Sequence, residues 1–468
     1  MRLSLLAVLL AAGCDTPATV TAPPPVAAPA APSFDYSAQA SKLNVIFISM
    51  DALRFDRTGA GGSTDMPNLD AFAKDAIFFT NTTSAAPWTV PSHMAMFTAR
   101  WPTLHGVTNK LKPGPEGDLV FQQLAPEIPT LPEKLVDAGW KAVAFTGGAG
   151  VQAKFGYGRK FETYLDDKPF AGMDYSGPPA MDWLRTHKAD HFFMFLHGYD
   201  AHGQHALLDQ DPRAAVPDYK GPLDGGIEEQ AKLREEGLAA IKKPGDPANL
   251  GDAVTAEDIR FLTAIYDAKV KAADVRLGKF LDTVKELGLF DTSIIVLVGD
   301  HGEEFMEHHY LDHGATLCDH QLHVPMIIRF PGGEGHGQVA DAVRTIDVFP
   351  TVFDALGVTP PDGINGTSLI PILQGKKLDL PIYSESDYRL FVHLRSEKKD
   401  GKKLVLDLED GQRSLYDLVA DPGEQTDLST TDARTTYEME QGVRSWLNTM
   451  KSDPKQFLGV EEEHIKLF

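Results

Sequence analysis

Short apolar runs rich in branched residues constrain the fold of this chain more than any other feature. They lie at residues 43–50, 141–145, 191–196, 293–298 and 324–330. A run without polar alternation is typical of a strand that is covered on both faces. Helical patterns lie between the runs, at residues 68–75, 132–138 and 258–287. Strands separated by helices predict an α/β fold with a mainly parallel central sheet flanked by helices.

The pattern changes after about residue 375. Two alternating runs, 404–408 and 414–418, flank the turn residues Asp410 and Gly411. This spacing predicts a hairpin in a small antiparallel sheet. We therefore expect a main α/β domain over residues 41–375 and a C-terminal α+β subdomain over residues 376–468. The charged stretch 208–253 interrupts the main domain and is interpreted as a surface excursion.

The N-terminal residues have the composition of an export signal. Arg2 precedes the largely apolar residues 3–12, which are too few to span a bilayer, since that takes roughly 20 residues. Residues 10–14 resemble the lipobox of bacterial lipoproteins. The resemblance implies that residues 1–13 are removed, that Cys14 is lipidated, and that the protein is exported to the bacterial cell envelope, in the periplasm or at the cell surface. A plain secreted protein cut nearby is the alternative. Residues 14–40 are rich in Pro and Ala and are predicted to form an extended tether.

The charge of the chain restricts its partners. Lys and Arg number 44 and Asp and Glu number 66, which gives a net charge of −22. This surface disfavours nucleic-acid binding, and an anionic substrate would need local positive charge, from a metal or an Arg. The only cysteines are Cys14 and Cys318. A disulfide scaffold and a zinc-binding cysteine cluster are therefore excluded, and Cys318 is interpreted as a core thiol.

Polar side chains gather in four short segments, and three of these segments follow predicted strands, where ligands bind in parallel sheets. They are Asp51, Thr89, Asp200, His202, His205, Asp300, His301 and His313. Carboxylates and imidazoles are ligands of divalent metals, and this mixed set favours zinc or manganese over calcium. A cation would activate the Thr89 hydroxyl and offset the charge of an anionic ester. Taken singly, a strand-end Asp is more often a helix cap and a lone His a core or surface residue, so the convergence of these residues carries the prediction.

The ordered motifs resemble those of the sulfatases in the alkaline phosphatase superfamily. They include residues 48–56, 66–73, 91–106, 298–303, 323–328, 347–351 and 415–424. The resemblance extends from about residue 43 to 427. It implies an alkaline phosphatase-like fold and metal-dependent hydrolysis of sulfate or phosphate esters. It also implies that Asp51, Asp300 and His301, with the Thr89 oxygen, surround one cation, and that His202 and His313 contact the ester.

Departures from the sulfatase pattern indicate a different nucleophile. Sulfatases carry a Cys or Ser that is oxidised to formylglycine, whereas residues 89–93 read Thr-Val-Pro-Ser-His. Thr cannot form that aldehyde, His93 replaces an Arg, and Ala52 replaces a second acid. These changes resemble the Thr-nucleophile phosphodiesterases and phosphoethanolamine transferases of the same superfamily. We therefore expect Thr89 to be the nucleophile and His93, His202 and His313 to be catalytic, with His202, His205 and His313 binding substrate.

Three alternatives remain open at this point. The chain could transfer a phospho-head group to envelope glycans or lipids, or it could be a catalytically inactive, sulfatase-like binding protein. Retention of the metal and nucleophile residues disfavours the inactive protein. The absence of any further stretch apolar enough to cross a membrane favours the hydrolase, because known transferases usually carry several membrane helices. The third alternative concerns metals: His202, His205, His313 and Asp200 could bind a second ion, although His205 could equally cap a loop.

Overall fold

The computed structural model describes residues 32–114, 118–203, 216–221, 223, 254–390 and 392–450. The predicted signal peptide, Cys14, His205 and nearly all of the charged stretch 208–253 lie outside the described residues. The boundaries predicted at residues 40 and 375 stay predictions. Phe34 and Tyr36, within the range predicted as tether, are buried, and the Tyr36 N–H donates to the carbonyl of Ala355 at 2.7 Å.

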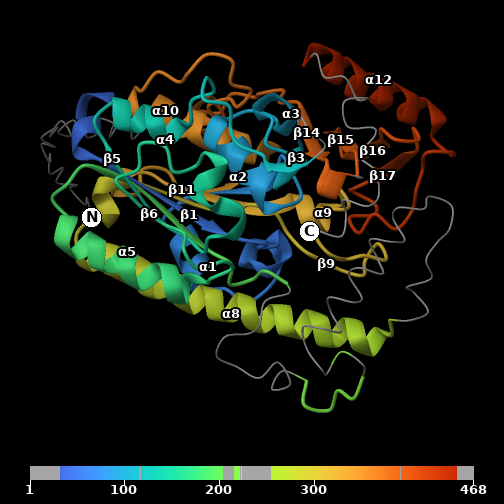
Figure 1. The fold of residues 1–468 in the computed structure, drawn as a ribbon, viewed down its shortest axis with the longest axis horizontal. Coiled ribbons are helices and arrows are strands. Elements are labelled where there is room, and N and C mark those ends of the chain that lie inside the picture. The colour runs from blue at the N-terminus through green and yellow to red at the C-terminus, as the bar shows by residue number, and fades with distance from the viewer. Residues whose placement is uncertain are drawn as a thin grey trace, which may run out of the picture. The chain divides into compact units, whose positions relative to one another are not determined.

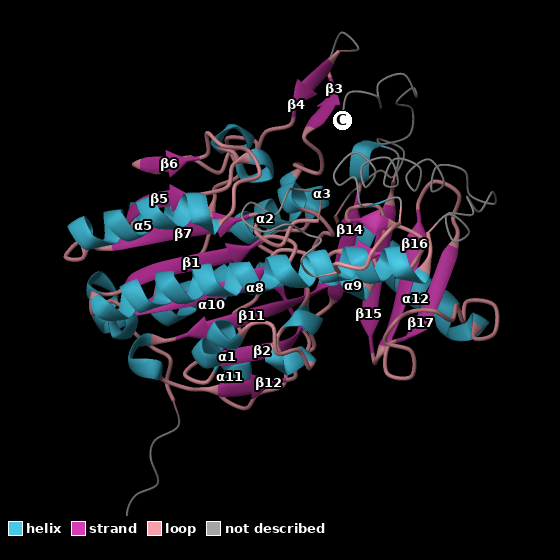
Figure 2. Cartoon of the chain, turned by 90° about the horizontal axis from the view of Figure 1, so that it is seen from below, coloured by secondary structure: helices cyan, strands magenta, loops and turns pink. Residues whose placement is uncertain are grey.

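A nine-stranded sheet forms the centre of the fold (Figure 2). Its order is β12 (Gly337–Val339), β2 (Ile77–Thr83), β11 (His323–Arg329), β8 (Ser293–Gly299), β1 (Asn44–Met50), β7 (Phe192–Gly198), β5 (Lys141–Phe145) and β6 (Thr163–Leu165), with β13 (Val343–Arg344) paired to β2. Only β11 runs antiparallel to its neighbours. The predicted mainly parallel sheet is confirmed, and the five predicted strands are β1, β5, β7, β8 and β11.

Helices cover both faces of this sheet (Figure 1). In β1, Val45 and Phe47 belong to one buried cluster and Ile46 and Ile48 to the other, as expected where successive side chains point to opposite faces. The first cluster includes residues of α2 (Thr89–Thr98), α4 (Leu131–Asp137) and α10 (Val348–Leu356). The second includes residues of α1 (Pro67–Ala73), α5 (Met173–His187) and α8 (Ala256–Glu286).

A smaller antiparallel sheet lies beside the first (Figure 2). It consists of β14 (Ile382–Ser386), β15 (Leu394–Lys399), β16 (Lys402–Asp407) and β17 (Arg413–Asp417), and α12 (Ala433–Thr449) packs on it through Val443 and Trp446. The predicted hairpin is β16–β17 and is confirmed. The remaining α-helices and strands are α3 (Pro102–His105), α9 (Asp319–Leu322), α11 (Ile370–Leu373), β3 (Leu111–Pro113), β4 (Leu119–Phe121), β9 (Glu304–Phe305) and β10 (Leu311–Asp312).

The sequence does not predict four strands of the central sheet, the short β6, β12 and β13 and the longer β2. The second half of β2 reads Thr-Asn-Thr-Thr, so its apolar run is too short to stand out. No helix within the described ranges is both long enough and apolar enough to span a bilayer.

Candidate metal and nucleophile site

Neighbouring parallel strands bring the predicted site residues to one edge of the sheet. Met50, the last residue of β1, pairs with Gly198 of β7 and Gly299 of β8. Asp51 and Asp300 each follow directly. Because both strands end at the same level, the two carboxylates are neighbours, in the position where α/β sheets bind ligands.

Thr89 is the first residue of α2 and is buried. Its Oγ1 lies 3.1 Å from Oδ2 of Asp51 and 3.3 Å from Nε2 of His301. Trp88 is extended and ends the preceding segment, and Pro91 suits the first turn because that turn leaves backbone N–H groups unpaired. The positive end of the helix dipole therefore lies beside the Thr89 hydroxyl.

Asp51, Asp300 and His301 have the geometry of a metal site. One ligand atom of each lies within 4.8 Å of the others, and Nε2 of His301 is 3.4 Å from Oδ2 of Asp300 and 3.8 Å from Oδ1 of Asp51. Both carboxylate oxygens are buried without a hydrogen-bond partner. Buried charge without compensation is costly, so these residues fit a divalent cation.

The charge states of the three residues are consistent with this fit. Burial, together with the nearby Asp300 carboxylate, raises the pKa of Asp51 well above its ordinary value. Burial also disfavours ionisation of Asp300, but the His301 and His93 imidazoles outweigh it and lower the pKa of Asp300. Burial lowers the pKa of His301 to about 4, so this imidazole is neutral at pH 7, which is the form that binds metals.

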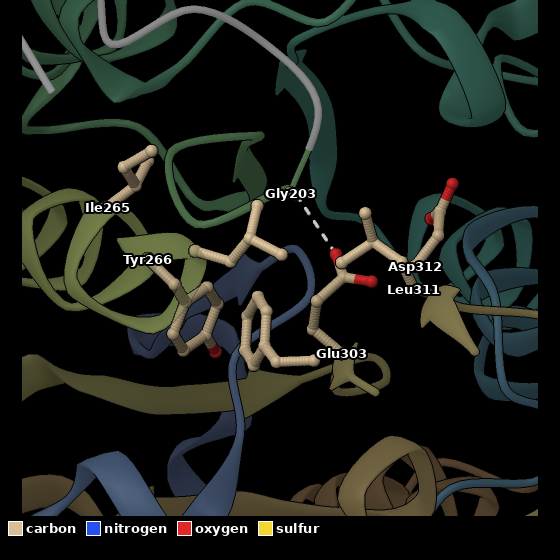
Figure 3. Close-up of a pocket in the computed structure, with 8 residues that line it drawn as sticks. Gly203, Ile265, Tyr266, Glu303, Leu311 and Asp312 are labelled. Carbon is tan, nitrogen blue, oxygen red and sulfur yellow. Dashed lines mark hydrogen bonds between the residues drawn. The ribbon is translucent and has the colours of Figure 1, made fainter. Parts of the chain in front are cut away.

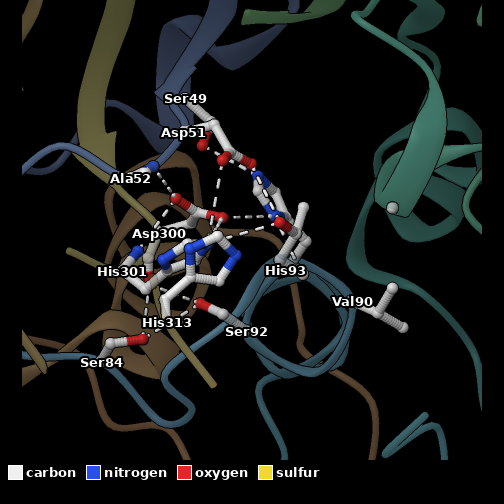
Figure 4. A network of polar contacts seen from close by, with 12 residues as sticks. Ser49, Asp51, Ala52, Ser84, Val90, Ser92, His93, Asp300, His301 and His313 are labelled. Carbon is white, nitrogen blue, oxygen red and sulfur yellow. Dashed lines mark hydrogen bonds and ion pairs between the residues drawn. The ribbon is translucent and has the colours of Figure 1, made fainter. Parts of the chain in front are cut away.

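Asp300 is held in place by several hydrogen bonds (Figure 4). Its Oδ1 accepts from the N–H groups of Ala52 at 3.1 Å and His301 at 2.9 Å. Its carbonyl accepts from the hydroxyls of Ser84 at 2.5 Å and Ser92 at 2.7 Å. Ala52 has φ of 57°, a left-handed conformation that is uncommon for a residue with a Cβ. This turn directs the Ala52 N–H at Asp300.

His93 contacts Asp300 and the backbone carbonyl of Thr89 rather than the Thr89 hydroxyl. Its Nδ1 is 3.0 Å from the Thr89 carbonyl and 3.2 Å from Oδ2 of Asp300. Since both neighbours are acceptors, Nδ1 carries the proton, and Nε2 accepts from the Ser49 hydroxyl at 2.8 Å. The sequence places His93 among the catalytic residues; this geometry suits it to positioning Asp300.

His202 and His313 lie together next to the metal residues. The His313 ring centroid is 4.3 Å from that of His301 and 4.7 Å from that of His202. His313 therefore lies beside His301, which contacts the Thr89 hydroxyl, and His202 lies beside His313.

Two acidic residues that the sequence analysis does not place in the site hold His313. Its Nδ1 is 2.7 Å from Oδ1 of Asp312 and 3.1 Å from Oε1 of Glu303. Burial opposes protonation, but these carboxylates raise the pKa of His313 well above its ordinary value. Glu303 accepts from the Gly203 N–H at 3.0 Å, beside a cavity of about 20 Å³ (Figure 3). That volume holds about one water molecule.

Asp200 does not join the cluster with which the sequence groups it. Its carboxylate pairs with the Arg276 guanidinium of α8 at 2.5 Å and accepts from the Met173 N–H at 2.7 Å. Asp200 thus joins α8 to the start of α5, and a metal site that uses it is not supported among the described residues.

His197 is a site residue that the sequence analysis does not single out. It is fully buried in β7, and its Nε2 is 3.3 Å from Oδ2 of Asp51. Its Nδ1 accepts from the Gly147 N–H at 3.5 Å, so Nε2 carries the proton and donates to Asp51. An imidazole directly after an apolar run was the available signal.

Lys110 and Arg389 bring positive charge to this region. Burial lowers the pKa of Lys110, and the Asp312 and Asp51 carboxylates are near enough to oppose this shift. Arg389 is buried and close enough to Lys110 to act on the same pKa. Isolated basic residues in loops give no sequence signal, which is why neither was predicted.

Solved structures share this architecture. BT4656 in complex with its substrate D-glucosamine-2-N,6-O-disulfate has a TM-score of 0.70 at 19% identity, covering 89% of this chain and 99% of that one. Phosphonate monoester hydrolase of Agrobacterium radiobacter has a TM-score of 0.67 at 21% identity, covering 89% and 96%. The fold and the strand-end cluster define an alkaline phosphatase-like α/β protein.

Sequence comparisons identify the family. The model described as Sulfatase matches residues 43–358, and the one described as N-sulphoglucosamine sulphohydrolase, C-terminal, matches residues 306–453. The chain belongs to the sulfatase family, whose members hydrolyse esters. Arylsulfatase K of Canis lupus familiaris is 26% identical over 224 residues, covering 45% of this chain and 42% of the relative. The Mus musculus protein is 29% identical over 209 residues, covering 42% and 38%. The matches span about two fifths of these relatives.

Proposed function

We propose that this protein is a metal-dependent hydrolase of sulfate or phosphate esters with Thr89 as nucleophile in place of formylglycine. The observation that carries the proposal is the position of the Thr89 hydroxyl. It lies at the start of α2, between a carboxylate of Asp51 and an imidazole of His301. A Thr that merely capped the helix would have no need of these two neighbours.

Asp51, Asp300 and His301 would hold the cation, with the Thr89 oxygen beside it. Two carboxylates and one imidazole favour zinc or manganese over calcium. When bound, the cation would supply positive charge that lowers the pKa of the Thr89 hydroxyl and offsets the charge of the ester. His197 and His93 would keep Asp51 and Asp300 oriented, through the contacts described above.

The reaction would take two displacements at phosphorus or sulfur. The Thr89 oxygen forms a bond to that atom while the bond to the leaving alcohol oxygen breaks. The leaving oxygen takes a proton from Nε2 of His313, the nitrogen that the two carboxylates leave free to face the ester. The Thr89 hydroxyl loses its proton to solvent as its new bond forms. Water then attacks the same atom and the bond to the Thr89 oxygen breaks; one proton of the water returns to Thr89 and the other returns to His313. Lys110, Arg389 and His202 would bind the anionic ester.

Mutation of Thr89 tests this function. With a panel of aryl sulfate, phosphomonoester and phosphodiester substrates, Thr89→Ala should lose turnover on whichever ester the wild type hydrolyses. It should keep its fold and most of its metal, because three ligands remain. Thr89→Ser should keep partial activity, since the hydroxyl survives. Thr430→Ala, a change at an exposed Thr, is the matched control. Full activity in Thr89→Ala, or a mass shift showing an aldehyde elsewhere, would contradict the proposal.

We also propose that the protein is an envelope lipoprotein anchored through Cys14. The support is the sequence of residues 10–14, which resembles a lipobox. Labelled palmitate supplied to a bacterial host should enter the wild-type chain and not Cys14→Ser. Equal labelling of both chains, or of neither, would contradict the anchor and leave the proposed hydrolysis unaffected.

A further inference from the structure

We propose that His308, Cys318 and His320 form a second metal site, which takes zinc or a similar borderline-soft divalent ion. One ligand atom of each residue lies within 4.8 Å of the others. The set shares no residue with Asp51, Asp300 and His301. One thiolate with two imidazoles is a ligand set that suits zinc.

Two segments of the chain build this site. His308 lies just after β9, in a turn where Met306 and His309 have φ of 73° and 61°. Cys318 precedes α9 directly, and His320 is the second residue of that short helix. The His308 and His320 ring centroids are 5.6 Å apart. Ligands at about 2.0–2.3 Å from one zinc ion are about 3.3–3.8 Å apart, so side-chain movements of about 1 Å would complete the set.

One ring nitrogen of His320 has no hydrogen-bond partner among the described residues. Its Nδ1 is buried and has no hydrogen-bond partner. Its Nε2 lies 4.0 Å from Oε1 of Glu307. A buried ring nitrogen without a hydrogen-bond partner is available to a metal ion.

His308 is oriented as metal-binding histidines are. Its Nδ1 is 2.9 Å from Oε1 of Glu304, and its Nε2 is 3.1 Å from the Gly423 carbonyl. To bind the ion, one ring nitrogen of His308 must give up its present acceptor, and the other keeps an acceptor that fixes the ring. Since Gly423 follows β17, the ion would also tie the segment after β9 to the C-terminal sheet.

Cys318 is the only thiol among the described residues, and it is buried. A free thiol has an ordinary pKa of about 8.5 and is protonated at neutral pH. Binding forms the sulfur–zinc bond and releases one proton to solvent.

Cobalt binding tests the site in the full-length chain. Cobalt(II) bound to a thiolate gives a near-ultraviolet charge-transfer band that carboxylate and imidazole ligands do not give. The metal-free wild type should develop this band with about one equivalent of cobalt, and so should Asp51→Asn. Cys318→Ser should lose the band and one zinc per chain. Cys14→Ser should keep both, which assigns the signal to Cys318.

The histidine ligands need their own controls. His320→Ala should weaken cobalt binding at least tenfold, whereas His336→Ala, at an exposed histidine, should leave it unchanged. Zinc should raise the melting temperature of the wild type and of His336→Ala more than that of Cys318→Ser, which keeps only the Asp51 site. Absence of the band in folded wild type, its persistence in Cys318→Ser, or equal zinc content in the two chains would overturn the site. None of these results depends on Thr89.

Discussion

Replacing His197 with Phe should weaken metal binding at the catalytic site about 10- to 100-fold. Oδ2 of Asp51 has two donors, the Thr89 hydroxyl at 3.1 Å and Nε2 of His197 at 3.3 Å. Phe fills the same space and removes the second donor. A hydrogen bond to a charged group contributes about 1.5–3 kcal/mol, and about 1.4 kcal/mol is a factor of ten in affinity.

The assay is competition between the protein and a chelator of known affinity. Cys318→Ser should be the background for both chains, so that only one class of site is counted. His191→Phe, at the opposite end of the same run, is the matched control and should bind metal like the parent. Far-UV circular dichroism establishes that both variants are folded. An affinity within twofold of the parent in folded His197→Phe would refute the reasoning.

Three further outcomes are expected. Lys403→Met should lower the free energy of unfolding by about 3–5 kcal/mol in urea titrations, because a buried pair loses one partner; the Lys403 ammonium is fully buried, 3.0 Å from Asp319 and 2.5 Å from Glu424. Burial opposes the ionisation of Asp319, but Lys398 and Lys403 lower its pKa. The stabilisation from the ionised Asp319 is therefore present above the unfolded pKa of about 3.9 and is lost as pH falls below it. The difference in free energy of unfolding between the wild type and Lys403→Met should shrink in unfolding curves from pH 7 to pH 3. Lys110→Met should raise KM for an anionic ester more than it lowers kcat, which steady-state kinetics would measure.

The sequence predicts best those site residues that follow an apolar strand directly. Asp51 and Asp300 stand out because each is the first charge after a buried run, and parallel pairing then places them together. His197 was missed although it follows the run 191–196 directly, because a lone His is more often a core or surface residue. Lys110 was missed because it reaches the region from a loop. The second-metal alternative that groups Asp200 with His202 is not supported, because the Asp200 carboxylate pairs with Arg276 of α8.

The strands of the fold could be predicted for the same reason. The prediction failed for β2, where polar residues hide the apolar pattern of a strand. β1, β5, β7, β8 and β11 are apolar almost throughout, whereas half of β2 is polar. β2 nevertheless pairs with β11, β12 and β13. The strands on either side of β2 supply its hydrogen bonds, and the order of apolar and polar residues in the sequence does not show this pairing.

The spacing of the site residues along the chain has a consequence for how the proposed cation would be acquired. The Thr89 hydroxyl contacts Asp51, 38 positions away, and His301, 212 positions away. An unfolded chain cannot hold these groups near one another, so it has almost no affinity for the ion. Loading must follow completion of the β8–β1 pairing, a slow, non-local event in folding. Every tenfold excess of free metal over its dissociation constant then adds about 1.4 kcal/mol to the stability of the folded chain.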